Sequence, residues 1–545
     1  MVELEFREKT KALIDSLKNI CAHYGLGNDG NEFKIITQTF LYKFLNDKFA
    51  YEAKKIDENV AKAEVWEEAL VAMSEDDLEM LQLQMGGDTA HLKPHHFISY
   101  LFSQQNTPDF AKLFDDTLRD IALTNNDVFA VKTDGGAKVV LFDRISEYIA
   151  DESKRDTFCR AIINKLVEFS FERIFTQKFD FYATIFEYLI KDYNSNSGGK
   201  YAEYYTPHAV ARIMAAILVP KEQQGKVKNV SCYDPSAGSG TLLMNVAHAI
   251  GESRCSIYTQ DISQKSSNLL RLNLILNNLV HSIPNVIQGN TILHPYHRDG
   301  KDLKRFDYIV SNPPFKMDFS DFREELESRE NKERFFAGIP KIKPKDKNKM
   351  EIYQLFLQHI IHSLKPGGKA AVVVPTGFIT AQSGIDKGIR EYLVKHKMLA
   401  GVVSMPSNIF ATTGTNVSIL FMDDSNKDKV VLIDASNLGE KIKDGKNQKT
   451  VLTPAEEQRI IDTFNAKSAV EGFSVAVSYE EVEAKNFSLS AGQYFNVKVE
   501  YVDITPAQFA KKMQGFTSNL DGLFSQSRDL ESEIQKQLAG LRFNA

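Results

Sequence analysis

The sequence predicts an α/β protein with a doubly wound sheet, a helical region before the sheet and a helical tail after it. Five short apolar segments typical of buried strands lie between residues 229 and 374. A glycine-rich turn follows the first of them and opens a helical pattern. The regions before and after these segments repeat apolar residues at the three- and four-residue spacing of helices.

The chain of 545 residues is long enough for several domains, and we expect four parts. Residues 1–175 are predicted to be a helical domain, because Phe33, Ile36, Phe40 and Phe44 share one helical face, as do Leu78, Leu81 and Met85. A linker rich in Ser, Asn and Gly is expected at 176–200. The α/β domain is assigned to 201–480 and the helical tail to 481–545.

Composition narrows the class of protein. Hydrophobic residues make up 43% and charged residues 25%, as in an ordinary globular protein. There is no apolar run of membrane-spanning length and no signal-peptide core at Met1, so we expect a cytoplasmic protein without a membrane partner. The four cysteines are scattered, and His91, His95 and His96 have no cysteine nearby, so no metal is expected.

The glycine-rich turn follows the predicted strand at 229–233. Gly238 and Gly240 would let the backbone pass close to a ligand where a Cβ atom would collide. The pattern is neither GxGxxG nor a P-loop, and an ordinary strand-to-helix turn is the alternative. The turn favours a nucleotide-like cofactor held by Asp234, Pro235, Ser236, Ala237, Gly238, Ser239, Gly240 and Thr241.

An acid stands about twenty residues beyond this turn, where Rossmann-type sites hold ribose hydroxyls. Asp261 ends the second predicted strand, 256–260, and is our candidate for that role. The alternative role is that of a helix N-cap, because a helical pattern runs from Ser263 to Asn277. Both roles could coexist.

A tetrapeptide after the predicted strand 306–311 is the candidate for the chemistry, and the alternative is a proline-rich end of a strand without a catalytic role. The Asn312 side-chain oxygen and the Pro313 carbonyl can both accept N–H bonds from a planar amine and so expose its lone pair. Two prolines, Pro313 and Pro314, restrict the backbone before substrate arrives. The Phe315 ring can stack on a base that has rotated out of a duplex.

Taken in this order, the glycine turn and the tetrapeptide resemble the catalytic half of DNA amino-methyltransferases, which use S-adenosylmethionine and a Rossmann-like sheet. A segment at 200–208 resembles the part of such enzymes that covers the cofactor, with Thr206 expected as N-cap and Pro207 as first helical residue. The resemblance implies cofactor contacts from Glu203, Tyr204, Tyr205, Thr206, Pro207, His208 and, through its side-chain oxygen at the adenine amine, Asn290.

Across nearly its whole length the chain is similar to the modification subunit of a type I restriction–modification system. That family methylates N6 of adenine in duplex DNA. The resemblance implies four partners: DNA, a specificity subunit, a second copy of the modification subunit and a restriction subunit with translocase and nuclease activity. Two positions depart from the common pattern, since Glu203 stands where Gln is frequent and Asn290 where an acid is frequent.

The net charge of −6 is unusual for a protein that holds DNA unaided, because phosphate neutralisation supplies most non-specific affinity. We therefore expect another subunit to supply most of the DNA affinity. A polar connection at 316–350 follows the tetrapeptide and ends in five alternating lysines. It is either a solvated loop or a segment that closes on DNA phosphates.

The tail repeats apolar residues in steps of three and four, the pattern of a coiled coil or helical bundle. It either binds a partner or folds back on the N-terminal helices. The residues of this seam are Phe509, Met513, Phe516, Leu520, Leu523, Leu530, Ile534 and Leu541.

Three alternatives to adenine methylation remain. Methylation of cytosine N4 uses the same kind of amine, and analysis of modified nucleosides separates the two. A catalytically idle DNA-binding scaffold is disfavoured by the intact Asn312, Pro313 and Phe315. Methylation of RNA or of a protein glutamine is disfavoured only by the resemblance, because the helical regions on either side are similar to those of the type I subunit.

Overall fold

The computed structural model describes residues 2–27, 30–172, 175, 206–410, 416–444, 447–495 and 504–540. The chain divides into two compact units, Met1–Tyr494 and Phe495–Ala545. The linker predicted at 176–200 lies outside the described residues, and the domain boundaries at 175 and 480 stay predictions. None of the described helices combines the length and the apolar character that crossing a bilayer requires.

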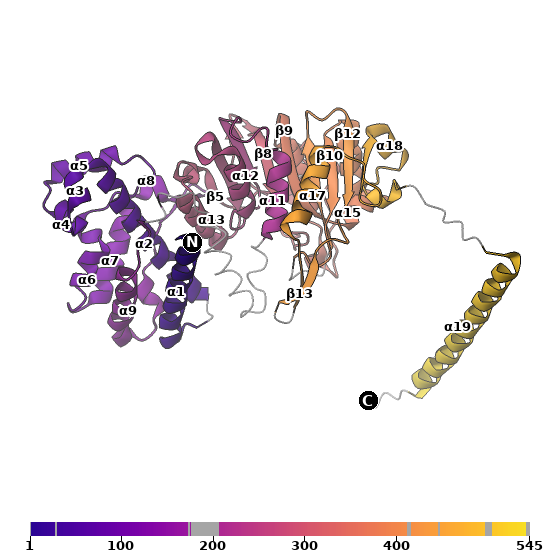
Figure 1. The fold of residues 1–545 in the computed structure, drawn as a ribbon, viewed down its shortest axis with the longest axis horizontal. Coiled ribbons are helices and arrows are strands. Elements are labelled where there is room, and N and C mark those ends of the chain that lie inside the picture. The colour runs from indigo at the N-terminus through magenta and orange to yellow at the C-terminus, as the bar shows by residue number, and fades with distance from the viewer. Residues whose placement is uncertain are drawn as a thin grey trace. The chain divides into compact units, whose positions relative to one another are not determined.

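Helices dominate the N-terminal region, as predicted (Figure 1). The expected apolar face of the longest of them is buried, with Phe33, Ile36, Phe40 and Phe44 each at most 6% exposed. The helices are α1 (Val2–His23), α2 (Gly30–Ile56), α3 (Glu58–Lys62), α4 (Trp66–Val71), α5 (Glu75–Gln84), α6 (Ile98–Ser103), α7 (Phe110–Thr124), α8 (Asn126–Phe129) and α9 (Arg155–Val167).

One large mixed sheet is the centre of the first unit. Its strand order is β15-β12-β10-β11-β9-β8-β3-β4-β5-β1-β2. The five predicted strands are confirmed as β3 (Val230–Asp234), β4 (Cys255–Asp261), β5 (Val286–Gln288), β8 (Phe306–Ser311) and β9 (Leu364–Pro375). The others are β1 (Val131–Thr133), β2 (Lys138–Val139), β10 (Leu399–Ser404), β11 (Val417–Asp423), β12 (Lys429–Asp434) and β15 (Ser474–Ser478).

The strand order reverses between β3 and β8. From β3 the chain moves outward through β4 to β5, then returns to the other side of β3 and continues through β8 to β9, all in parallel. The next neighbour, β11, runs antiparallel to both β9 and β10. Ligands of doubly wound sheets bind at such a reversal, beyond the carboxyl ends of the strands.

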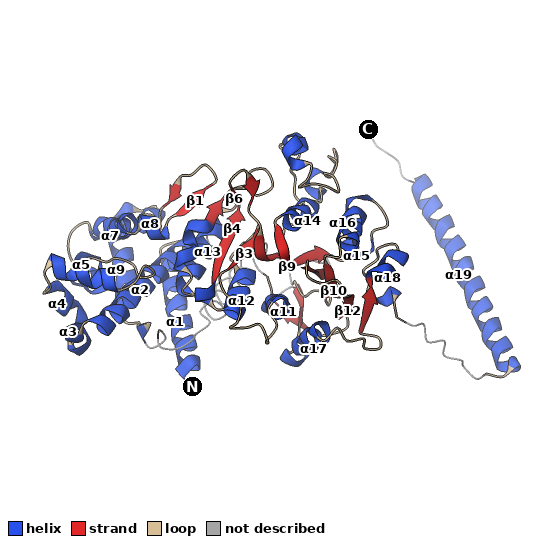
Figure 2. Ribbon diagram, turned by 90° about the horizontal axis from the view of Figure 1, so that it is seen from above, coloured by secondary structure: helices blue, strands red, loops and turns tan. Residues whose placement is uncertain are grey.

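Helices cover both faces of the sheet, which explains why its central strands read as apolar runs. Figure 2 shows α11 (His208–Leu218), α12 (Thr241–Ile250) and α17 (Pro454–Asn465) on one side of it. On the other side lie α14 (Tyr353–His362) and α16 (Gly384–Lys395). The predicted fold class is confirmed.

Smaller elements complete this unit. They are the short helices α15 (Gly377–Thr380) and α18 (Tyr479–Ala484) and two hairpins, β6 (Arg298–Asp299) with β7 (Asp302–Leu303) and β13 (Glu440–Asp444) with β14 (Asn447–Val451). Helix α13 (Gln264–Leu276) is longer and follows β4.

The N-terminal region contributes two strands that the expectation of an all-helical domain did not include. Strand β1 pairs in parallel with β5, with Lys132 opposite Ile287, and β2 pairs with β1. The buried Arg271 of α13 reinforces this junction. Its guanidinium donates to the carbonyl oxygens of Val139 and Val140, both at 3.0 Å. The helical region and the sheet therefore share hydrogen bonds.

The second unit contains one long helix, α19 (Pro506–Gly540). It is continuous through Gly515 and Gly522, which confirms the predicted helical tail. The predicted seam is 46–62% exposed from Phe509 to Ile534, whereas Leu541 lies outside the described residues.

We predict that Arg271→Ala lowers the free energy of unfolding by roughly 2–4 kcal/mol, because it removes the buried side chain that donates hydrogen bonds to the carbonyl oxygens of 139–141. Arg329→Ala is the matched control, since Arg329 is exposed. Chemical denaturation of both variants checks this. Equal stability of the two variants would contradict the role given to Arg271.

Candidate active site

The glycine-rich loop after β3 turns tightly into α12. Gly238 and Gly240 have φ angles of 54° and 85°, in the left-handed region. The left-handed φ of Gly240 disfavours any residue with a Cβ atom, and such an atom would also lie 2.3 Å from Leu270 Cδ1, so the end of that side chain would have to move. The close approach of a ligand to Gly238 and Gly240, which the sequence predicts, stays a prediction.

A cavity of about 280 Å³, a volume that includes its opening to solvent, lies between this loop, the start of α11 and the end of β8. Helix α12 begins at this cavity, which places backbone N–H groups beside it. The lining includes one acid and no basic side chain among the described residues, a character that suits a cationic ligand. The lining residues are Thr206, Asp234, Ser236, Ala237, Gly238, Ser239, Thr241, Leu242 and Asn312.

The acid of this lining, Asp234, joins the ends of β3 and β8. Its Oδ1 atom accepts from the Ser236 N–H at 2.9 Å and from the Ser311 hydroxyl at 3.0 Å. Burial raises the pKa of the Asp234 carboxyl to about 7, although these two donors act in the opposite direction. A positive charge in the cavity would favour the carboxylate form.

Asp261 holds the glycine loop in place from the end of β4. One carboxylate oxygen accepts from the Gly238 N–H at 2.9 Å and the other from the Ser263 N–H at 2.8 Å. The alternative assignment of Asp261 as a helix N-cap is wrong, because Ser263 caps α13 through the Ser266 N–H. Each oxygen of Asp261 keeps a further acceptor direction, so contact with a ribose stays a proposal.

The Asn312 side chain lies at the carboxyl end of β8 and lines the cavity. Its Nδ2 atom donates to the Thr206 hydroxyl at 3.3 Å, which leaves Oδ1 as the acceptor available to an incoming amine. Thr206 was expected to cap α11, but this helix begins at His208 with Pro207 as its N-cap residue. The expected cap and first helical residue are therefore each wrong by one position, and the Thr206 hydroxyl serves Asn312 instead.

The rest of the tetrapeptide has graded exposure. Pro313 is buried, Pro314 is exposed and Phe315 is half-buried. The Phe315 ring meets the buried Tyr353 ring edge-on, with 6.2 Å between their centroids. Tyr353 in turn donates to Asp386 Oδ1 at 2.8 Å, so the ring behind Phe315 is fixed.

Asn290 uses its side-chain oxygen locally. Oδ1 accepts from the Ile292 and Leu293 N–H groups at 3.0 and 3.1 Å. Both acceptor directions are therefore used, and a contact with a cofactor would fall to the amide nitrogen, a donor, instead of the expected oxygen.

Of the cofactor residues expected at 203–208, Glu203, Tyr204 and Tyr205 lie outside the described residues. Pro207 and His208 are not part of the cavity lining, unlike Thr206. Pro235 and Gly240 also stand outside the lining and shape the loop.

Two buried residues that the sequence analysis missed support the glycine loop. The Thr291 hydroxyl donates to the Pro235 carbonyl at 2.7 Å, and Asn273 Nδ2 donates to the Ser239 carbonyl at 2.6 Å. A polar residue inside the apolar pattern of α13 was the available signal for Asn273.

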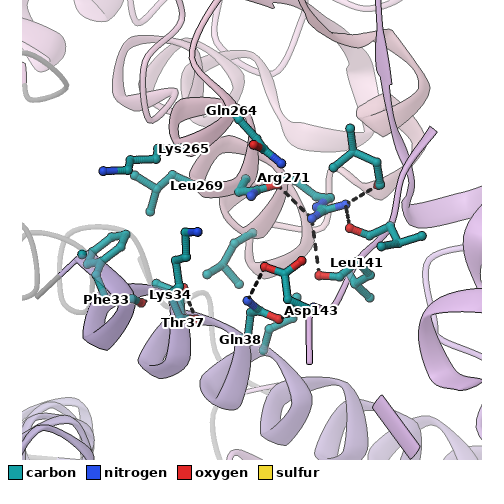
Figure 3. A pocket seen from close by; sticks show the side chains of 16 residues that line it. Phe33, Lys34, Thr37, Gln38, Leu141, Asp143, Gln264, Lys265, Leu269 and Arg271 are labelled. Atoms are coloured by element: carbon teal, nitrogen blue, oxygen red, sulfur yellow. Dashed lines mark hydrogen bonds between the residues drawn. The ribbon is translucent and has the colours of Figure 1, made fainter. Parts of the chain in front are cut away.

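A second, larger cavity of about 710 Å³ lies between α2, residues 139–143 and α13 (Figure 3). Lys34 and Gln38 of α2 face Gln264 and Lys265 of α13 across it, and Gln38 donates to Asp143 at 3.2 Å. It contains none of the predicted site residues.

His95, His96 and Asp120 form the one group in the described part of the chain whose side chains cluster as metal ligands would. His96 Nδ1 accepts from the Lys93 N–H at 3.1 Å, so the neutral ring carries its proton on Nε2, 2.8 Å from Asp120 Oδ2. That nitrogen is therefore a donor, and the cluster is a hydrogen-bonded one.

Similarity to known proteins agrees with this geometry. The N-6 DNA Methylase family matches residues 177–502. The chain is 28% identical over 366 residues to the type I restriction enzyme MpnII methylase subunit of Mycoplasma pneumoniae, covering 65% of this chain and 63% of that one. It is 27% identical over 377 residues to the HindI methylase subunit of Haemophilus influenzae, covering 67% and 79%.

The fold is similar to that of the type I restriction–modification methyltransferase subunit from Streptococcus thermophilus. The TM-score is 0.69 at 21% identity, over 89% of this chain and 100% of that one. The family match covers more than half of the chain and includes both the glycine loop and the tetrapeptide. The chain belongs to the N-6 DNA methylase family.

Proposed function

We propose that this chain is the methylating subunit of a type I restriction–modification complex and transfers a methyl group from S-adenosylmethionine to N6 of adenine in duplex DNA. One observation carries the proposal. Asn312, at the end of β8, lines the same cavity as the glycine loop after β3, with its amide nitrogen bonded to Thr206.

The cavity suits S-adenosylmethionine. Bound there, this cofactor supplies an electrophilic methyl group on a positively charged sulfur. The buried Asp234 would face its cationic groups, and the N–H groups at the start of α12 would receive its carboxylate. Asp261 would accept from the ribose hydroxyls with the acceptor directions that Gly238 and Ser263 leave.

Asn312 and Pro313 would activate the target amine. Its lone pair is delocalised into the adenine ring, which makes it a poor nucleophile. Two N–H bonds, to Asn312 Oδ1 and to the Pro313 carbonyl, would draw the nitrogen toward tetrahedral geometry and free the lone pair. Because Thr206 holds the Asn312 amide and the two prolines restrict the backbone, reorganisation of the two acceptors would cost little.

Phe315 would hold the target base outside the duplex, since the amine is unreachable within the stack. Tyr353 supports its ring from behind. Transfer would be direct and in line, without a covalent enzyme intermediate.

Partner subunits would supply the DNA affinity and the choice of sequence that this chain lacks. With a net charge of −6, the chain alone should bind DNA weakly and without sequence preference. We propose that a specificity subunit chooses the site and that a second modification subunit and a restriction subunit join the complex. The exposed seam of α19 is the proposed contact with the specificity subunit.

We predict that Asn312→Ala and Phe315→Ala each lower the methylation rate at least about 100-fold, because each removes a preorganised contact with the base. Calorimetry should show S-adenosylmethionine affinity near that of the wild type. Substantial residual methylation by Asn312→Ala would contradict the proposed role of Asn312 in activating the amine.

Thr206 supplies the matched pair of controls. Thr206→Ser keeps the hydroxyl that accepts from Asn312, and Thr206→Val removes it. The valine variant should lose kcat with KM for DNA little changed, and serine should restore it. If both variants behave alike, Thr206 does not orient Asn312.

We predict that S-adenosylmethionine affinity falls as the pH drops below about 7, the pKa of the Asp234 carboxyl. A cationic ligand binds the carboxylate form, so below this pKa binding must release a proton. The limiting loss is about tenfold in affinity per pH unit. Asp234→Asn should bind more weakly above pH 7 and lose this pH dependence.

Calorimetry in buffers of different ionisation enthalpy measures the proton released. A pH-independent affinity of the wild type would show that Asp234 does not face the positive charge of the cofactor.

We predict that truncation after Val502 leaves a folded chain that binds S-adenosylmethionine but no longer assembles with the specificity subunit. The reason is that α19 carries an apolar seam that is exposed along its length. Size-exclusion chromatography measures assembly, and thermal unfolding measures folding. A large fall in the melting temperature with assembly retained would instead indicate that the tail packs on its own chain.

A further inference from the structure

The connection from the catalytic tetrapeptide to α14 returns to its starting point. The Met317 N–H donates to the Met350 carbonyl at 3.0 Å, two residues after Phe315. Phe315 and Tyr353, which flank this hydrogen bond in the sequence, are in ring contact. The residues just before Met350 therefore lie near the tetrapeptide.

This connection has its own core and is not an unsupported loop. The buried Arg334 donates to the carbonyl oxygens of Thr291 and Ile292, both at 2.7 Å, and to His359 Nδ1 at 3.0 Å. It thereby ties the connection to the segment after β5 and to α14. The apolar side chains of this core are Ile292, Phe319, Leu326, Phe335, Met350, Ile352, Leu355 and Phe356.

Residues 341–349 precede the last part of this core and form an exposed basic segment. They contain five lysines and one acid, Asp346, in a chain whose net charge is −6. Two of the lysines have acidic partners, with Lys343 3.7 Å from Glu351 and Lys349 2.8 Å from Asp346.

The other three lysines, Lys341, Lys345 and Lys347, are exposed and form no salt bridge within the described part of the chain. The pKa of Asp318 is lowered, chiefly by the Ser320 N–H and in part by the charge of Lys347. This places Lys347 near the segment that follows Phe315.

We propose that the basic segment 341–349 holds the DNA phosphates that flank the target adenine. The inference rests on the proposed function. A base can reach Asn312 only after leaving its stack, and the strand on either side must then stay beside the tetrapeptide. Lysine contacts with phosphate position a strand without reading its sequence, which agrees with a separate subunit for site choice.

The position of the segment favours DNA over an acidic protein surface. The segment ends beside the tetrapeptide, where the DNA strand must lie if one of its bases is to enter the site. The buried Arg334 anchors the connection that contains the segment, which lowers the entropic cost of ordering the segment on DNA. The rest of the chain is acidic on balance, so this local excess of positive charge attracts phosphate to one place.

The test replaces Lys341, Lys345 and Lys347 together by Gln in the full chain. The matched control replaces Lys221, Lys226 and Lys228 by Gln. These three are also exposed, but they precede β3 and so lie toward the amino ends of the strands, opposite the site. Both variants change the net charge by the same amount.

Fluorescence anisotropy with a short fluorescein-labelled duplex of arbitrary sequence, at low and rising salt, measures DNA binding. Log affinity falls as log salt rises, and loss of three phosphate contacts should make this negative slope shallower by about 2–3 in the test variant. The control should keep the wild-type slope. Calorimetry should give the same S-adenosylmethionine affinity for all three proteins.

Equal slopes in the two variants would overturn the proposal. It would also be overturned if the test variant bound the duplex normally but failed to bind the purified specificity subunit, because the segment would then face protein. Failure of the proposed function is a separate result: the wild-type chain in its complex would neither bind S-adenosylmethionine nor methylate DNA.

Discussion

The parallel pairing of β3 with β8 is the constraint on which the site depends. These strands are far apart in sequence, yet Cys232 lies opposite Tyr308 in the sheet. Because both run the same way, the glycine loop and the tetrapeptide emerge at the same edge. The hydrogen bond from Ser311 to Asp234 then fixes one to the other. Without this pairing, the two motifs would be present in the chain but would not form one cavity.

Much of this arrangement could be predicted from the sequence because its signals are local. Strands buried on both faces appear as apolar runs, and a glycine turn between a strand and a helix has few conformations available. The roles proposed for Asn312 and Phe315 rest on their chemistry and on the resemblance of the two motifs. The order of the motifs, with the acid Asp261 between them, pointed to one site.

The parts that could not be predicted depend on partners distant in sequence. Strand β1 is short, with the half-buried Lys132 in its middle, so it lacks the apolar pattern of a strand. The Thr206 hydroxyl serves Asn312 rather than its own helix, and the Asn290 oxygen accepts locally. Arg271 and Arg334 are buried largely against backbone carbonyls, which any sequence supplies, so no pattern of opposite charges identifies them in advance.

The exposed seam of α19 has a consequence for the cell that makes this protein. If the seam binds the specificity subunit as proposed, a copy without that subunit would carry large apolar side chains in water along this 35-residue helix. Such surfaces promote self-association and attract chaperones and proteases. The lifetime of the chain would then depend on the ratio in which it and its partner are synthesised. A surplus copy would be removed, so a helix that assembled the complex would also set the dose of the enzyme.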